Sequence, residues 1–168
     1  MAQLNGDHPA EESLSLSYAM CAQALLVSPE NSHLSDTYYR LARQSFEKAE
    51  LEGSGADFLG LFALQSLILI AFYELRHGYI PRAGLSAAKA MRLIQMIDLH
   101  RMDNVSPPSG DRSPPSSPMS SLNPPEQEER RRTFWAAYSV DCLISVFLYD
   151  STAMEEREVS DSERDFFV

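Results

Sequence analysis

Residues that commonly do chemistry are few in this 168-residue sequence, and they do not cluster. The four histidines stand far apart: His8, His33, His77 and His100. The last two lie near predicted helix ends, where the helix dipole favours a cation without any catalytic role. The sequence has no glycine-rich phosphate loop, no Gly-x-Ser-x-Gly or His-Glu-x-x-His motif, and no paired-cysteine metal motif. We therefore predict that the chain is not an enzyme and carries no cofactor or metal ion of its own.

Two sets of polar residues interrupt apolar segments. Glu74 lies in one of them, and a buried carboxylate with a raised pKa can act as a general acid or base. We favour the ordinary alternative, an ion pair with an arginine such as Arg92 or Arg132. Asp141 and Ser145 stand four residues apart in the other segment. There we expect a hydrogen-bonded stripe within the core, with a ligand or partner contact as the alternative.

The composition is that of an acidic protein from a reducing compartment. The formal net charge is −10, and Arg130–Arg132, the only basic cluster, directly follows three glutamates within 126–129. Proteins usually bind DNA through clustered Lys and Arg, and here the glutamates offset the charge of the one such cluster. We therefore expect no direct nucleic-acid binding and instead expect a protein partner. Cys21 and Cys142 lie in apolar helical patterns, which predict two buried free thiols in the cytosol or nucleus.

Apolar spacing predicts five helices and no convincing strand. The fold class is therefore all-α, an irregular helical bundle with a long disordered Pro/Ser loop. The helices are expected over Ala10–Val27, Asp36–Leu51, Phe58–His77, Pro81–Ile97 and Asn123–Tyr149. The third is apolar nearly all round and should be central, and Tyr38 should face inward on the second. The apolar stretches 58–73 and 134–149 have 16 residues each, shorter than the roughly 20 of a membrane span, so no membrane contact is expected.

Local residues set the expected ends of these helices and of the domain. Gly78 should end the third helix, and Asn123 with Glu126 should form a capping box at the start of the fifth. Gly84 and neighbouring alanines should allow a close approach of another helix. We expect residues 1–9 to be disordered, 10–150 to form the helical domain, and 151–168 to form an acidic, frayed tail.

A Pro/Ser-rich segment separates the fourth and fifth helices. Residues 102–125 contain seven of the ten prolines and seven serines, too few apolar groups to offset the entropy of ordering them. We expect a disordered loop. Its three Ser-Pro pairs make Ser106, Ser113 and Ser117 candidate phosphorylation sites for proline-directed kinases, although we favour a simple spacer.

The order of three segments resembles a known family. The first segment, 64–75, contains Gln65, the second ends in Leu99-His100-Arg101, and the third reads Glu-Glu-Arg-Arg-Arg-Thr-Phe-Trp-Ala-Ala-Tyr-Ser-Val-Asp from Glu128. This order resembles the middle homology region, a regulatory domain, of fungal zinc binuclear cluster (six-cysteine) transcription factors. The resemblance spans about 35–154, with Asp98 where the family usually has glycine. The matching motif residues are Gln65, His100, Arg101, Arg131, Arg132, Phe134, Trp135, Tyr138 and Asp141.

The resemblance implies a nuclear protein that regulates RNA polymerase II transcription. In that family a zinc cluster reads DNA, and this sequence lacks it. We therefore expect either a truncated fragment or a free-standing regulator that binds protein partners, possible ones being a full-length transcription factor or a second copy. Phe134, Trp135 and Tyr138 should anchor the core, while Arg131 and Arg132 should pair with carboxylates of neighbouring helices. The alternative function is a tetratricopeptide-like scaffold with no role in transcription, located in the cytosol.

Overall fold

The computed structural model describes residues 11–28, 30–52, 60–101 and 122–164. Within these ranges all regular structure is helical, as predicted. The α-helices are α1 (Glu11–Leu26), α2 (Ser35–Glu52), α3 (Leu61–Arg76), α4 (Ile80–Met96) and α5 (Pro124–Arg164), with short 3-10 helices η1 (Ser32–Leu34) and η2 (Leu99–Arg101). The side chains of 11–12, 101 and 149–164 lie outside the description.

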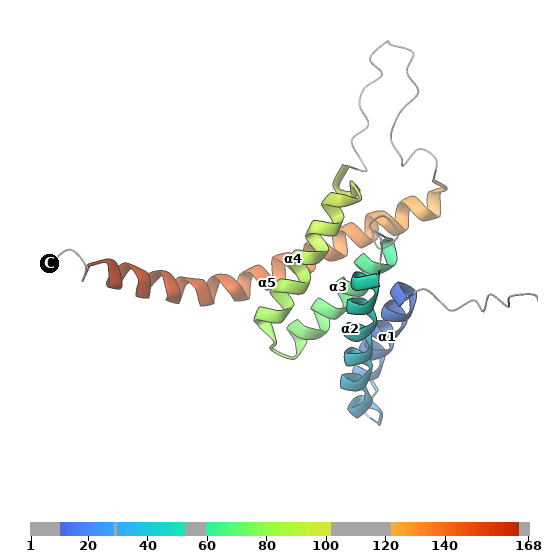
Figure 1. Cartoon of the computed structure of the whole chain (residues 1–168), viewed down its shortest axis with the longest axis horizontal. Helices are drawn as coiled ribbons and strands as arrows, with labels where there is room; N and C mark the ends of the chain where they lie inside the picture. The colour runs from blue at the N-terminus through green and yellow to red at the C-terminus, as the bar shows by residue number, and fades with distance from the viewer. Residues whose placement is uncertain (1–10, 29, 53–59, 102–121, 165–168) are drawn as a thin grey trace, which may run out of the picture.

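Helix α3 is the centre of the bundle, because it contacts all four other α-helices. The hairpin of α1 and α2 packs on one side of it, and α4 folds back beside it (Figure 1). Helix α5 crosses α3 and α4, and its last part extends away from the other helices (Figure 1). The long loop expected over 102–125 falls mostly on residues 102–121, outside the described residues.

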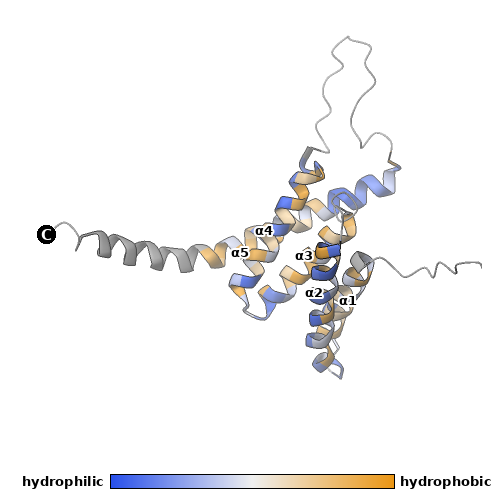
Figure 2. Ribbon diagram, in the orientation of Figure 1, coloured by the Kyte–Doolittle hydropathy of each residue, from blue (hydrophilic) through white to orange (hydrophobic). Residues whose placement is uncertain are grey.

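Apolar residues of α3 and the middle of α5 line the inside of the bundle (Figure 2). The residues buried on α3 confirm that this helix is central: Ala63, Leu64, Ser66, Leu67, Ile68, Ile70, Ala71, Tyr73 and Glu74. On α2 the inward tyrosine is Tyr39, with Tyr38 only half-buried, so the expectation that Tyr38 faces inward was wrong. Tyr39 faces inward because its hydroxyl group donates a hydrogen bond to Glu74 inside the bundle.

Two residues with left-handed backbone end helices in the middle of the chain. Gly78 has φ 72° after α3, as predicted from the tolerance of glycine for this conformation. Asp98 has φ 53° after α4. The glycine that the resemblance implies at this position would adopt this conformation readily, and aspartate is among the few other residues that do so with some ease.

The fifth helix is longer than expected. It was expected to end near Tyr149 and to be followed by a frayed tail, but its backbone continues to Arg164. Residues 150–164 contain no proline or glycine, and their glutamates, arginines, alanine and methionine favour helix. Negative charge was therefore a poor guide to the end of this helix.

Candidate interaction surface

The start of α5 is fixed by hydrogen bonds at its first turn. The Asn123 side-chain oxygen accepts from the Glu126 amide at 2.9 Å, and the Glu126 carboxylate accepts from the Asn123 amide at 3.2 Å. This is the predicted capping box. It fixes where the helix begins after the Pro/Ser-rich segment.

The arginines of the family motif pair within their own helix. Glu128 accepts from Arg131 at 2.9 Å and from Arg132 at 2.8 Å, and Arg132 and Arg131 lower the pKa of its carboxyl group. For Arg132, the expected pairing with a carboxylate of a neighbouring helix was wrong. At i+3 and i+4, both guanidinium groups lie on the same side of the helix as Glu128.

Gln65 connects the central helix to α5. Its Nε2 donates to the Glu129 carboxylate at 3.0 Å and to the Thr133 hydroxyl at 3.2 Å. The Thr133 side chain also donates to the Glu129 carbonyl oxygen. A polar side chain of the mostly apolar central helix thus holds α5 in register, which gives this motif residue a structural role.

The inner face of α5 packs on the bundle through small or aliphatic residues. Ala137, Val140 and Ile144 are buried on it. A Cβ atom on Gly84 of α4 would lie 3.0 Å from a methyl group of Leu148. The predicted close approach of another helix at Gly84 is therefore confirmed, and the helix is α5.

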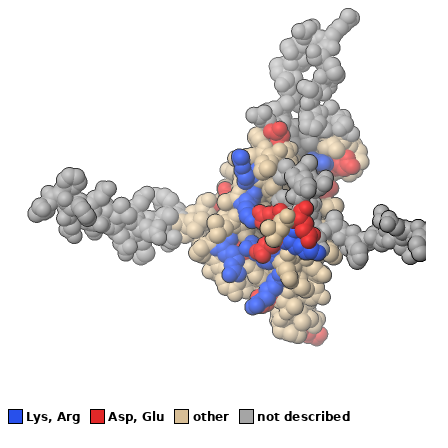
Figure 3. Space-filling view, in the orientation of Figure 1, with Lys and Arg blue, Asp and Glu red and all other residues tan. Residues whose placement is uncertain are grey.

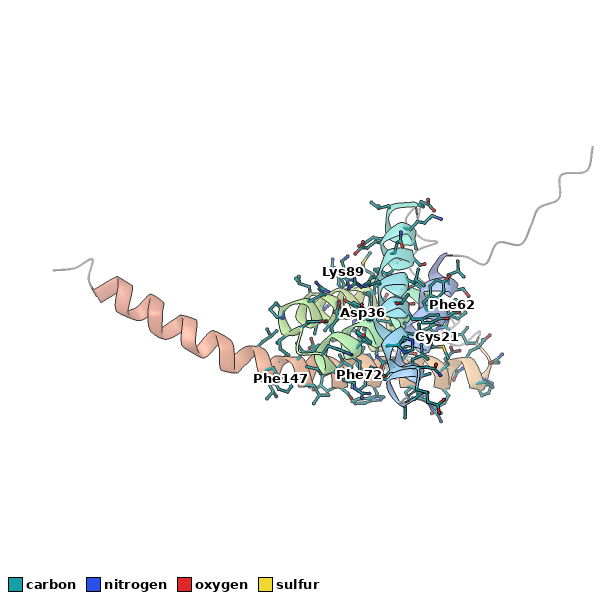
Figure 4. The ribbon with its side chains drawn as sticks, turned by 90° about the horizontal axis from the view of Figure 1, so that it is seen from below. Cys21, Asp36, Phe62, Phe72, Lys89 and Phe147 are labelled. Atoms are coloured by element: carbon teal, nitrogen blue, oxygen red, sulfur yellow. The ribbon has the colours of Figure 1, made fainter. Side chains whose placement is uncertain are left out.

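The opposite face of α5, the outward face, is apolar and exposed. It carries Trp135, Tyr138, Leu143, Val146 and Phe147, with exposed fractions from 46% for Tyr138 to 69% for Val146. Figure 4, which views the molecule from below, shows Phe147 and Phe72 on the side of the molecule along which α5 runs. Soluble proteins seldom leave so many large apolar groups together in water, so this face has the character of a contact surface.

Three aromatic residues form a cluster at the start of the outward face, which we call the aromatic platform: Phe134, Trp135 and Tyr138. The Trp135 ring meets the Tyr138 ring edge-on with centroids 5.9 Å apart, and it meets Phe134 in the same way at 5.5 Å. A hydrogen bond with Cys142 raises the pKa of Tyr138.

The expectation that this cluster anchors the core was wrong for two of its members. Trp135 and Tyr138 are about half exposed, and only Phe134 packs partly against the core. The inward positions of the helix are taken by 133, 137, 140 and 144, which places 135 and 138 on the other side. Cys142 shares this outward face and Cys21 is also exposed, so the prediction of buried thiols was wrong as well.

A buried carboxylate joins α2, α3 and α4. Glu74 is fully buried, and its two oxygens accept from the Tyr39 hydroxyl at 2.6 Å and from the Ser86 hydroxyl at 2.7 Å. Its ionic partner is Arg43, at 3.7 Å, rather than the expected Arg92 or Arg132. Arg82 donates to the Tyr39 hydroxyl, completing the network. With both oxygens engaged, Glu74 holds helices together and is not placed as a free acid or base.

The pKa of Tyr39 rises to about 12 in this network. Burial is the main cause, followed by the hydrogen bond to Glu74. The proton therefore stays on the tyrosine, which donates to the carboxylate. Among the described residues, every buried side-chain polar atom has a hydrogen-bond partner.

The remaining predicted site residues lie apart from this network. His77 caps α3, with Nδ1 2.9 Å from the Tyr73 carbonyl oxygen, in agreement with a helix-end role. His100 is exposed in η2, which packs against α5, and the Arg101 side chain is not described. Asp141 is half-buried and Ser145 exposed, so the expected polar stripe lies at the surface and not in the core.

Charges on the described surface are mixed. Figure 3 shows basic and acidic side chains side by side on the face that includes α2 and α4, where Lys89 binds the Glu50 carboxylate at 2.7 Å. The described residues include no group of His, Cys, Asp and Glu placed to hold a metal ion. In the same part of the chain, no helix has both the length and the apolar character to cross a membrane.

Comparison with known proteins relates the chain to transcription regulators. A family model described as fungal specific transcription factor domain matches residues 3–158. The chain is 34% identical over 131 residues to the citrinin biosynthesis transcriptional activator mrl3 of Monascus ruber. The matched region covers 78% of this chain and 24% of the relative. It is 36% identical over 139 residues to the pigment biosynthesis transcriptional activator pigB of the same fungus, covering 83% and 24%.

A third relative is the ascochitine biosynthesis cluster transcriptional regulator of Didymella fabae. It is 32% identical over 142 residues, which cover 83% of this chain and 23% of the relative. The chain thus spans about a quarter of the length of the curated relatives it matches. No solved structure matches it significantly.

Proposed function

Because this chain belongs to the fungal specific transcription factor domain family, we propose that it is a regulatory domain that controls transcription through protein contacts. The observation that carries the proposal is the apolar outward face of α5, which lies on a helix held to the bundle by the family motif residue Gln65. Two relatives of this chain are named as transcriptional activators of citrinin and pigment biosynthesis, and a third as the transcriptional regulator of the ascochitine biosynthesis cluster. We extend that role to this chain, with a biosynthetic gene cluster as its target.

The contacts are assigned to the second half of the outward face, where Leu143, Val146 and Phe147 are about half exposed or more. Burying such side chains against a partner is favourable by about 25 cal/mol for each Å² of apolar surface removed from water. DNA is not the assigned partner, because the chain carries a formal charge of −10 and its described surface is mixed. The proposal includes a nuclear location and no catalytic step.

A reporter assay in a filamentous fungus tests the proposal. The chain is fused to an unrelated DNA-binding domain whose sites precede a reporter gene, and the DNA-binding domain alone is the reference. The proposal predicts a nuclear fusion protein that raises or lowers reporter transcription. Reporter output equal to the reference, with equal amounts of fusion protein in the nucleus, would contradict it.

A further inference from the structure

We propose that the aromatic platform of α5 binds the chain's own Pro/Ser-rich segment, residues 106–118. The assignment is independent of the proposed function, because it concerns how one surface of this chain is covered. It uses the first half of the outward face and leaves Leu143, Val146 and Phe147 open to a partner.

The platform has the chemistry that recognises proline. Proline-rich segments dock on surfaces lined by tryptophan and tyrosine, because the proline ring packs flat on an aromatic ring and the chain loses little entropy on binding. Trp135 and Tyr138 stand edge to face at 5.9 Å and are 55% and 46% exposed. Between them and Val146, the outward positions Ser139 and Cys142 carry no charge. The surface thus offers ring faces with uncharged residues on their C-terminal side, while the ion-paired Arg131 and Arg132 lie on their N-terminal side.

Two properties of residues 106–118 favour this segment as the ligand of the aromatic platform: its composition and its covalent attachment next to α5. Residues 106–118 contain five prolines, among them Pro115-Ser-Ser-Pro118, and their charged residues, Asp111 and Arg112, cancel. Pro118 precedes Leu122 by four residues, so it can lie at most about 13 Å from Leu122. Pro114 precedes Leu122 by eight residues, so it can lie up to about 26 Å away. Trp135 follows Pro124 by eleven residues, a distance of about 17 Å along the helix. The chain around Pro114 and Pro115 can therefore reach the platform from the start of α5, whereas Pro118 is tethered too closely to do so.

Tethering also favours this segment over a second copy of the chain. A standard stable interface buries about 800 Å² on each partner, and the few half-exposed side chains of the platform supply only part of that area. A segment attached beside the platform has a high effective concentration, so a weak contact is sufficient to hold it.

Trp135 gives a direct test, because it is the only tryptophan of the chain. In the test variant, Pro107, Pro108, Pro114, Pro115 and Pro118 are all changed to Ser, which keeps the length and polarity of the segment. In the matched control, Ser109, Ser116 and Ser120 are changed to Gly and every proline is kept. Trp135 emission and acrylamide quenching are measured for the full chain, with far-UV circular dichroism to check that the helices are retained.

The proposal predicts a red shift of Trp135 emission and a roughly twofold larger quenching constant in the proline variant, since a ring face is uncovered. The serine control should match the natural sequence. Adding a synthetic peptide of residues 104–120 to the proline variant at about millimolar concentration, to match the effective concentration of the tethered segment, should reverse the shift. Equal quenching in all three proteins would overturn the proposal. A Trp135 signal that changes on dilution of the natural chain would also overturn it, in favour of a second copy.

Discussion

A single buried carboxylate illustrates how side chains hold this bundle together. Glu74 is removed from water, so its charge must be met by Tyr39, Ser86 and Arg43 from the helices on either side. Each of those contacts joins α3 to another helix. The network therefore converts one ionised group into a constraint on the packing of three helices.

Replacing Tyr39 with Phe should reduce the free energy of unfolding by about 1–3 kcal/mol near pH 8, because Glu74 loses a buried donor. The pKa of Tyr39 in the folded protein, about 12, lies above the ordinary tyrosine value of 10.0. A raised pKa means that this contribution is fully present below pH 10 and is lost as the pH rises toward 12. The difference between the natural protein and Tyr39→Phe should thus shrink across that range, as measured by urea unfolding.

The adjacent Tyr38 provides the control for this effect. It is half-buried, and Tyr38→Phe should change stability by less than about 0.5 kcal/mol. A constant difference between Tyr39→Phe and the natural protein from pH 9 to pH 12 would show that the hydroxyl proton does not contribute as argued.

Substituting Gly78 tests the left-handed end of α3. A Cβ at this position would meet no atom within 4 Å. Any loss of stability on substitution must therefore come from the backbone conformation, whose φ is 72°. Gly78→Ala should cost about 1–2 kcal/mol, and Gly78→Asn less, since Asn tolerates this conformation. Thermal or urea unfolding would measure both. Equal losses for Ala and Asn would point to a cause other than backbone conformation.

At the scale of the elements, α5 has two functions that separate by face. Its inner face packs against α4 through Gly84, and its outward face is left for contacts. The sequence predicted the close approach at Gly84 from small residues alone. It did not predict which side of α5 faces inward, because both sides are apolar and periodicity cannot then distinguish them.

A larger side chain at Gly84 should separate α4 from α5. Gly84→Leu should lower stability by about 1–3 kcal/mol through overpacking, whereas Gly84→Ala should be close to neutral because the end of the Leu148 side chain can shift. Chemical denaturation followed by circular dichroism measures both. If Gly84→Leu were as stable as Gly84→Ala, the packing of α5 on α4 described above would be wrong.

The link from Gln65 to α5 should govern how firmly the start of that helix is held. Gln65→Leu keeps the volume but removes the hydrogen bonds to Glu129 and Thr133, at a cost of about 1 kcal/mol. Amide hydrogen exchange over 126–133 should become faster. The control is Gln44→Leu on an exposed part of α2, which should leave that exchange unchanged. Unchanged exchange in Gln65→Leu would contradict the link.

At the scale of the whole molecule, the sequence predicted the helix number, most helix ends and the family. Those features follow from local residues such as Gly78, Asn123 and the Arg-Arg-Thr-Phe-Trp segment. The sequence did not predict the features that depend on which helices pack against one another. Trp135 and Tyr138 were placed in the core because of their residue type, but their exposure depends on where 133, 137, 140 and 144 pack. The partner of Glu74 likewise depends on a contact 31 residues away in sequence, between 43 and 74.

The most direct test of the central claim asks whether the outward face of α5 is needed for regulation. In the reporter fusion, Leu143→Asp with Val146→Asp is compared with Leu85→Asp and Met96→Asp, which alter exposed apolar residues of α4. All fusions are checked for equal helix content and equal nuclear amounts. We predict that the α5 pair abolishes the effect on transcription and that the α4 pair retains it. Full activity of the α5 pair, or equal loss from both pairs, would contradict the claim that this face makes the regulatory contact.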